Sequence, residues 1–409
     1  MIKNINGTFL VMVITMLSSF VTTIILGKTL SIEAFGEFAL LKQIILVGSS
    51  VAIFGLDFSY IKLFSKNHNS SLKLHLITII IVTLVSCLFM LVLNSIYDFQ
   101  LYKLFTLFLC IYFCAINLYQ AVIYRLKGQF ILAQLFAEGW KFILLLLIVL
   151  VIYSGIEISI QLVYHIFTVS AFIFSSFIIK KFYKTINIYN ENIEYKQYLT
   201  LGLIFWLINS TGLIYGGIDR LVIPILFGTE ALGIYTGASI VFVISLTMIG
   251  SAIGYVIYPL ITAGKEINLM KLFLAVIFII LLAMITFQIT GARLVSILFS
   301  GKFDSFINKK LIFCFTLLGS FQIVHIILHF ILSAIGSKMQ LLYYWLLSIL
   351  FIIITIMLLH FYKTDYSFNL FNISFIILLS QFGKIISMII LVKYADNKRN
   401  NIAENINYV

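Results

Sequence analysis

Charged residues are scarce in this sequence. Asp, Glu, Lys and Arg make up 10% of its 409 residues, whereas 62% are hydrophobic and the mean hydropathy is +1.13. Soluble domains carry about 25% charged residues, so this composition excludes an ordinary soluble protein. Cysteines are also few, and all four fall inside apolar runs, which indicates packing roles rather than a disulfide framework.

Long polar stretches are missing as well. The longest polar connection covers about residues 181–198. No segment is therefore large enough for a soluble catalytic or nucleotide-binding domain, which argues against an ATP-driven pump built from this chain alone.

The chain consists instead of apolar runs that are long enough to cross about 30 Å of hydrocarbon. The sequence therefore predicts an all-α polytopic membrane protein. About twelve spans are expected, at residues 8–27, 38–61, 74–94, 104–124, 131–153, 158–180, 199–223, 232–260, 270–290, 311–334, 340–361 and 370–393.

Lys and Arg are distributed unevenly across these spans. If the N-terminus is cytoplasmic, the inside segments hold sixteen of the 27 basic residues, the outside segments hold seven, and four lie within spans. Basic residues concentrate on the cytoplasmic side of membrane proteins, so both termini are expected in the cytoplasm. The net charge of +12 follows from this topology and from the anionic membrane lipids beneath it. It predicts no nucleic-acid partner.

Two short motifs recur in the same order in the two halves of the chain. Residues 32–39 read IEAFGEFA and residues 229–236 read TEALGIYT, which share E-A-x-G-x-[FY] at an offset of 197. Further on, KGQFIL at 127–132 resembles IGSKMQLL at 335–342. Both matches follow equivalent spans, which indicates a duplication.

The repeat predicts two pseudosymmetric six-helix bundles around a central cavity. Six spans per half give both halves the same orientation, as in parallel-repeat transporters, whose lobes rock about a central site. The predicted parts are an N-terminal bundle, a cytoplasmic linker, a C-terminal bundle and a cytoplasmic tail, at residues 1–180, 181–198, 199–393 and 394–409.

Asp219 and Arg220 are charged residues in the seventh predicted span, although a charge near mid-membrane costs about 2.5–3.5 kcal/mol. The nearby glycines leave room for a neighbouring helix or a ligand. Alternatively, Arg220 is close enough to the outer boundary to snorkel to the interface while Asp219 pairs locally. On a straight helix, Arg220 shares one stripe with Asn209, Gly212 and Gly216.

The second predicted span carries a polar stripe. Such a stripe indicates a helix that forms one wall of a water-lined cavity. Alternatively, Lys42 and Asp57 each reach a membrane interface. The stripe lies within about 120° of one helix face and consists of Lys42, Gln43, Ser49, Ser50 and Asp57.

Three further charges fall inside spans. Lys384 lies nearer the middle of the twelfth span than an interfacial residue would. Glu138 and Lys141, one turn apart near the cytoplasmic end of the fifth span, are expected to pair with each other.

Four segments carry a family likeness. GGIDRLVIPILFGTEALGIYTGASIV at 216–241 and LSIEAFGEFALLKQI at 30–44 resemble the seventh-to-eighth and first-to-second spans of polysaccharide repeat-unit flippases of the Wzx type. ILFSGKF at 297–303 and LSAIGSKMQLL at 332–342 resemble two later turns of the same transporters. These flippases belong to the multidrug/oligosaccharidyl-lipid/polysaccharide exporter (MOP) superfamily.

The resemblance implies a central cavity lined mainly by spans one, two, seven and eight. The implied cargo is an undecaprenyl-diphosphate-linked oligosaccharide, moved from the cytoplasmic to the outer leaflet of the bacterial inner membrane for O-antigen, capsule or exopolysaccharide synthesis. A polysaccharide polymerase and a chain-length regulator are the implied partners. No enzymatic reaction, cofactor or metal is expected.

A diphosphate that leaves water needs cationic partners. Asp219 is expected to hold Arg220 in place. Asp57 is a candidate for ion coupling, although an inside-negative membrane potential would itself drive anionic cargo outward. The residues expected to bind cargo are Arg220, Lys42, Lys384 and Asn209.

Two other functions stay open. A MATE-like small-molecule or drug antiporter would favour acidic residues for cationic cargo, whereas the expected spans hold four basic and three acidic residues. A membrane-embedded polysaccharide polymerase would carry its chemistry on a large outer loop. Here the longest outside stretch, about residues 291–310, holds a single acidic residue, Asp304.

Overall fold

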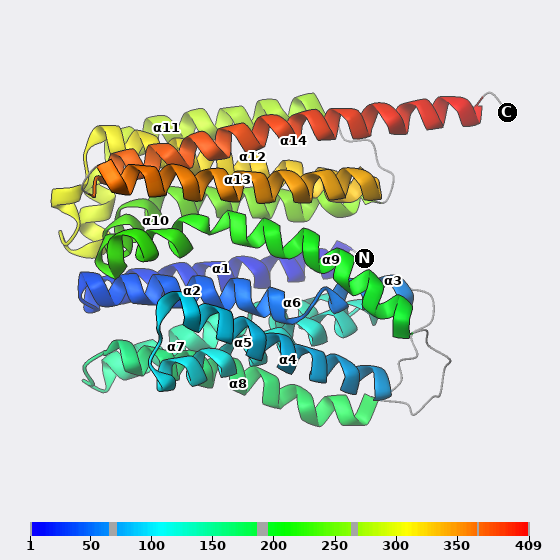
Figure 1. The fold of residues 1–409 in the computed structure, drawn as a ribbon, viewed down its shortest axis with the longest axis horizontal. Coiled ribbons are helices and arrows are strands. Elements are labelled where there is room, and N and C mark those ends of the chain that lie inside the picture. Colours follow the sequence, from blue (N-terminus) through cyan, green and yellow to red (C-terminus); the bar gives the residue numbers. More distant parts are fainter. Residues whose placement is uncertain (1, 65–71, 186–194, 263–268, 366–367, 408–409) are drawn as a thin grey trace. The chain divides into compact units, whose positions relative to one another are not determined.

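The structure is a computed structural model that describes residues 2–64, 72–185, 195–262, 269–365 and 368–407. Within these ranges the chain forms fourteen α-helices, one short 3₁₀ helix and no strand (Figure 1). Helices suit this composition, because a helix satisfies its own backbone hydrogen-bonding groups where lipid offers no partner. The predicted all-α class is confirmed.

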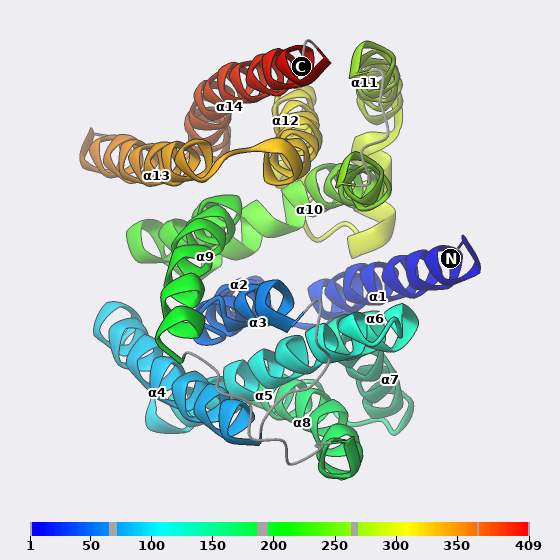
Figure 2. The same cartoon turned by 90° about the vertical axis from the view of Figure 1, so that its right-hand side faces the viewer.

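The helices form two compact units, which divide between Leu221 and Val222. In the first unit α5 packs against α2, α4 and α8, and α1 lies beside α6 and α7 (Figure 2). This unit holds the first turn of α10 and nine complete helices: α1 (Ile2–Thr29), α2 (Ile32–Ala52), α3 (Leu56–Phe64), α4 (Leu72–Tyr97), α5 (Leu101–Leu126), α6 (Phe130–Glu138), α7 (Trp140–Tyr153), α8 (Ile160–Thr185) and α9 (Tyr195–Gly216).

The second unit contains the rest of the chain. Its last helix, α14, packs against both α12 and α13, and α11 packs against α12. The elements are α10 (Ile218–Thr262, from Val222 on), α11 (Leu269–Phe299), the 3₁₀ helix η1 (Asp304–Phe306), α12 (Lys309–Ile335), α13 (Lys338–Asp365) and α14 (Leu370–Asn407).

Many helices of the structure are long and apolar enough to cross a membrane, as in a multi-pass membrane protein. Among the described residues there are ten such helices, and eleven spans if the bent pair α6–α7 counts as one. The shorter apolar helix Ile160–Ser176 coincides with the remaining predicted span, at residues 158–180, so the total of twelve stays a prediction.

The second predicted span, residues 38–61, is not one straight helix. A turn separates α2 from α3, and in it Phe54 (φ 53°) and Gly55 (φ 64°) have left-handed backbone angles. Residues in that region end a right-handed helix. The predicted polar stripe assumed one uninterrupted helix, whereas the structure places Lys42 in α2 and Asp57 in the separate helix α3.

Gly55 also allows α9 to approach this turn closely. A side chain at Gly55 would overlap the backbone of Gly202 and Trp206 in α9. Trp206 donates its indole N–H to the Val51 carbonyl oxygen at 2.9 Å. Position 55 therefore needs glycine for its backbone angle and for space.

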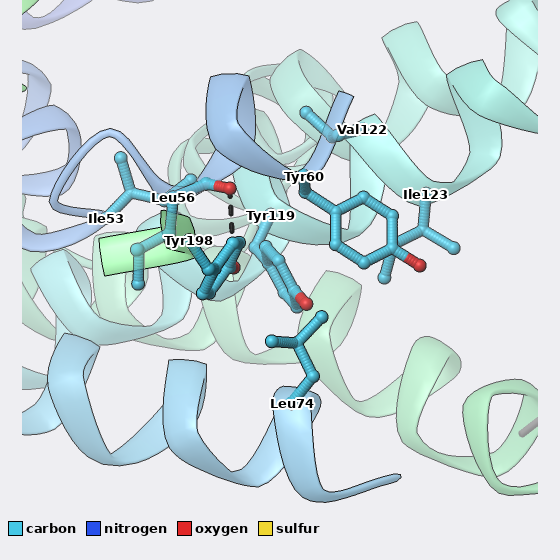
Figure 3. Close-up of a cluster of buried hydrophobic side chains, with 8 residues drawn as sticks. All are labelled: Ile53, Leu56, Tyr60, Leu74, Tyr119, Val122, Ile123 and Tyr198. Carbon is cyan, nitrogen blue, oxygen red and sulfur yellow. Dashed lines mark hydrogen bonds between the residues drawn. The ribbon is translucent and has the colours of Figure 1, made fainter. Parts of the chain in front are cut away.

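Tyr198 ties the start of α9 to the first unit. Its hydroxyl donates to the Leu56 carbonyl oxygen at 3.3 Å and lies 3.0 Å from Thr78 Oγ1. Figure 3 shows Tyr198 and Leu56 in a cluster of buried side chains with Ile53, Tyr60, Leu74, Tyr119, Val122 and Ile123.

The two units differ from the predicted domains. By packing, α9 joins the first unit, whereas the sequence prediction starts the C-terminal bundle at residue 199. Residues 181–185 of the predicted linker continue α8, and residues 186–194 lie outside the described residues. Residues 394–407 of the predicted tail continue α14. The boundaries of the six-plus-six division stay a prediction.

The repeated motifs lie at equivalent turns. E-A-x-G-x-[FY] follows Ser31 (φ −61°, ψ 164°) in the first half and Gly228 (φ 88°, ψ 168°), which divides α10 into two helices, in the second. Gly128 and Gly336 of the second motif lie at the α5–α6 and α12–α13 turns. Gly228 therefore marks the end of the seventh span, as Ser31 marks the end of the first.

Candidate functional site

Asp219 and Arg220 lie in the first turn of α10, directly after a break within the seventh span. The Gly217 amide donates to the Ile214 carbonyl at 3.3 Å, and the Arg220 amide donates to the Gly217 carbonyl at 3.1 Å. Glycine is a poor helix former, and two in succession, Gly216 and Gly217, favour this break. Asn209, Gly212 and Gly216 lie in α9, whereas Arg220 follows the break in α10, so the stripe that was predicted for all four residues is divided between two helices.

Gln43 of α2 fills the space beside this break. A side chain at Gly217 would overlap the Gln43 carboxamide. The same carboxamide accepts a hydrogen bond from Arg220, with 3.4 Å between Nη1 and Oε1. On the other side, Tyr97 of α4 donates its hydroxyl to the Leu221 carbonyl at 2.7 Å. The α9–α10 corner is thus held by α2 and α4.

Lys42, the neighbour of Gln43 in α2, lies within the electrostatic reach of Arg220. Lys42 Nζ donates to Thr23 Oγ1 of α1 at 2.9 Å. The positive charge of Arg220 acts on the Lys42 ammonium, and so does that of Lys141. The structure therefore brings together Lys42 and Arg220, which the sequence predicted as cargo-binding residues.

This arrangement suits an anionic group. Lys42 and Arg220 are both half-buried, where like charges repel more strongly than in water. Asp219, beside Arg220 and also half-buried, offsets part of this charge and lies at a helix N-terminus, which favours a carboxylate. A guanidinium and an ammonium in one place can donate several charge-assisted hydrogen bonds to phosphate oxygens.

Two other predicted residues lie apart from these cations. Asn209 is half-buried in α9, two turns before the break. Asp57 is in the first turn of α3, where the positive charge of Arg125 acts on it. Its Oδ1 atom is buried and accepts no hydrogen bond within the described part of the chain.

Lys384, the remaining predicted cargo-binding residue, belongs to the second unit. Its side chain is fully buried in α14, with Nζ 5.1 Å from the centroid of the Tyr344 ring in α13. The His329 ring of α12 lies 5.4 Å from the same Tyr344 ring. In this conformation Lys384 is enclosed by protein, and its role toward cargo stays a prediction.

The sequence reasoning missed a second ion pair in the first unit. Lys103 of α5 and Tyr164 of α8 both donate to Glu37 Oε1 of α2, at 2.5 and 3.0 Å. The sequence did contain a signal for Glu37, because this residue lies inside the repeated motif, whereas the second copy has Ile234 at the equivalent position. This cluster joins three helices and acts on stability.

The fold is that of MATE transporters. The chain is similar to the inward-facing conformation of a multidrug resistance MATE family transporter of the MOP superfamily, with a TM-score of 0.64, 14% identity, and coverage of 94% of this chain and 96% of that one. For the outward-facing conformation of such a transporter, the TM-score is 0.65 and the identity is 15%, with coverage of 98% of this chain and 96% of that one. For the bent form of the Vibrio cholerae MATE transporter VcmN, the TM-score is 0.63 and the identity is 12%, with coverage of 97% of each chain.

MATE transporters consist of two six-helix bundles, so the predicted fold class of two six-helix bundles is confirmed. The sequence profile of the family described as polysaccharide biosynthesis protein matches residues 1–265. The chain belongs to that family, which confirms the resemblance to the polysaccharide flippases of the superfamily. No curated protein matches the chain by sequence.

Proposed function

We propose that this protein translocates polyprenyl-diphosphate-linked oligosaccharide repeat units from the cytoplasmic to the outer leaflet of the bacterial inner membrane. The repeat units would serve O-antigen, capsule or exopolysaccharide synthesis. The observation that carries the proposal is the convergence of Lys42 and Arg220 in a transporter of the polysaccharide biosynthesis family. In polysaccharide synthesis, the cargo that carries a diphosphate is the lipid-linked sugar, and two cations can bind that diphosphate.

The physical chemistry of the cargo supports this assignment. The diphosphate is costly to move through hydrocarbon unless cations replace its water. Lys42 and Arg220 would supply them, and Asp219 would keep Arg220 from standing as an uncompensated charge. Asn209, which lies two turns before the break in α9, would contact the polar part of the cargo. Lys384 would contact the cargo only in a state that exposes its side chain.

Energy coupling has two candidate sources. An inside-negative potential favours outward movement of anionic cargo by about 2.3 kcal/mol per charge per 100 mV. Asp57, with a buried carboxylate oxygen that accepts no hydrogen bond among the described residues, is the candidate for ion exchange. Replacing Asp57 with Asn distinguishes the two, because only the second requires a titratable group there.

The proposal also includes the membrane topology and the partner proteins of the transporter. Both termini would be cytoplasmic, as the distribution of basic residues predicts. A polysaccharide polymerase and a chain-length regulator would act on the delivered repeat units. A MATE-like drug antiporter shares the fold, but a site with two cations suits cationic drugs poorly.

The test uses cells that make the matching glycan, with this protein removed and then restored. Polyprenyl-diphosphate-linked repeat units and their sidedness are quantified. We expect single, unpolymerised repeats to accumulate on the cytoplasmic face, and to be cleared by the wild type but not by Arg220→Ala at matched expression. Repeats that still reach the outer face without being polymerised would indicate a polymerase. No change in either pool would indicate export of another molecule.

A further inference from the structure

The fifth span is broken in its interior. α6 ends at Glu138, α7 begins at Trp140, and the two helices bend by 49° about Gly139. A side chain at Gly139 would overlap the Leu135 carbonyl oxygen and the Phe174 ring. Breaks of this kind within a span are where transporters commonly build ligand and ion sites.

The charged residues on either side of this break form the ion pair that the sequence predicted. Lys141 Nζ contacts Glu138 Oε2, and the two side chains expose 14% and 30% of their surface. Lys141 Nζ also lies 5.8 Å from the ring centroid of Trp140. An ion pair that is partly exposed adds only about 0–1 kcal/mol, so stability alone does not explain charges at this place.

Lys141 belongs to a helix that shares a neighbour, α1, with the candidate site. The helix α1 packs against α2, α6 and α7 (Figure 2), and it carries Thr23, the acceptor for Lys42. The charge of Lys141 acts on the Lys42 ammonium together with that of Arg220. Three basic side chains of the first unit, on α2, α7 and α10, are therefore electrostatic neighbours.

We propose that Lys141 is a third cargo-binding cation, which Glu138 holds until an anionic headgroup takes the place of the carboxylate. The inference rests on the proposed function and assigns a further binding residue to it. A diphosphate carries more negative charge than one carboxylate and accepts hydrogen bonds from several cations at once. The exchange keeps Lys141 paired before and after binding, which avoids an uncompensated charge in the membrane. When the cargo leaves, Glu138 regains Lys141 and so assists release.

The test measures binding of farnesyl diphosphate to the purified full-length protein by isothermal titration calorimetry. Removing the competing carboxylate with Glu138→Gln should tighten binding severalfold. Lys141→Met should weaken it about tenfold, the loss expected for one charge-assisted hydrogen bond. In the double variant, Glu138→Gln should no longer tighten binding, because the lysine on which it acts is gone.

Two controls exclude an effect of misfolding. Thermal unfolding of each variant is recorded in parallel, since a purely structural pair would lose stability in either single variant. The matched controls are Glu37→Gln and Lys103→Met, which remove the Glu37–Lys103 ion pair and should leave the affinity for farnesyl diphosphate unchanged.

The sign of the Glu138→Gln effect decides the outcome. Unchanged or weaker binding in this variant, with binding that still depends on Arg220, would overturn the exchange while leaving the proposed function intact. Wild-type protein that does not bind the probe, or binds it equally well after Arg220→Ala, would overturn both.

Discussion

The Gln43 carboxamide occupies the space that a side chain on Gly217 would fill. This contact places Arg220 against Gln43, while the preceding residue of α2, Lys42, donates to Thr23. With the repeat offset of 197, Thr23 and Arg220 are equivalent positions of the two halves. Adjacent residues of α2 thus contact the same position in both copies, a hydroxyl in one and a guanidinium in the other. The duplication accounts for the helices that the two halves share, whereas the charged residue at this position occurs only in the second half.

Gly217→Ala tests this contact. The added methyl group must displace Gln43, and with it the partner of Arg220, so we expect transport to fall at least tenfold at matched expression. The measurement is clearance of lipid-linked repeat units from the cytoplasmic leaflet. Gly216→Ala is the matched control, because a side chain there meets no atom within 4 Å. Equal activity in the two variants would refute the role of the contact.

Lys42→Met should impair transport about as strongly as Arg220→Ala, because either change removes one of the cations that would bind the diphosphate. Thr23→Val removes the acceptor of Lys42 but keeps its charge, so its effect should be several times smaller. Both are measured with the same leaflet assay. If Thr23→Val is as damaging as Lys42→Met, the lysine acts through its hydrogen bond and not through its charge.

Sequence patterns predicted the all-α class and a multi-pass membrane protein, because both follow from hydrophobic length. They also predicted the Glu138–Lys141 pair, since residues three apart are neighbours along a helix and remain so across the bend at Gly139. The same patterns failed where a helix is interrupted. Trp206 and Gln43 come from other helices and lie against the glycines at these breaks, Gly55 and Gly217. A pattern within one span does not indicate such contacts.

The candidate site was predicted in part for the same reason. Lys42 and Arg220 stood out as basic residues in apolar runs, and they do converge. Asp57 was predicted to share one helix with Lys42, but the turn at Phe54 and Gly55 puts it in the separate helix α3. The Glu37–Lys103 pair joins α2 to α5 across 66 positions of sequence, and no periodicity within one span indicates such a contact.

Gly55→Ala should destabilise the first unit far more than Gly128→Ala. Both glycines have left-handed backbone angles, φ 64° and 73°, so each alanine costs about 1–2 kcal/mol in backbone strain. Only position 55 also faces the backbone of α9, and overpacking there should add about 1–3 kcal/mol. The check is the thermal unfolding midpoint of the purified protein. Equal midpoints for the two variants would show that α9 does not press against this turn.

Lys384→Met separates a buried structural role from contact with cargo. The side chain is 0% exposed and lies over Tyr344, and an apolar residue of similar volume often replaces a buried charge without loss of stability. We therefore expect an unfolding midpoint at or above that of the wild type, together with reduced transport, because Lys384 would contact the cargo in a state that exposes it. Loss of transport without loss of stability would mean that Lys384 reaches cargo in another conformation.

The most direct test of the central claim is flipping by the purified protein in liposomes. A fluorescent polyprenyl-diphosphate oligosaccharide is placed in both leaflets, and a membrane-impermeant quencher reports how much of it reaches the outer leaflet over time. We predict that vesicles with wild-type protein expose nearly all of the lipid, whereas vesicles with Arg220→Ala or Lys42→Met expose about half, as protein-free vesicles do. Wild-type vesicles that expose no more lipid than protein-free ones, or variants as active as the wild type, would contradict the account.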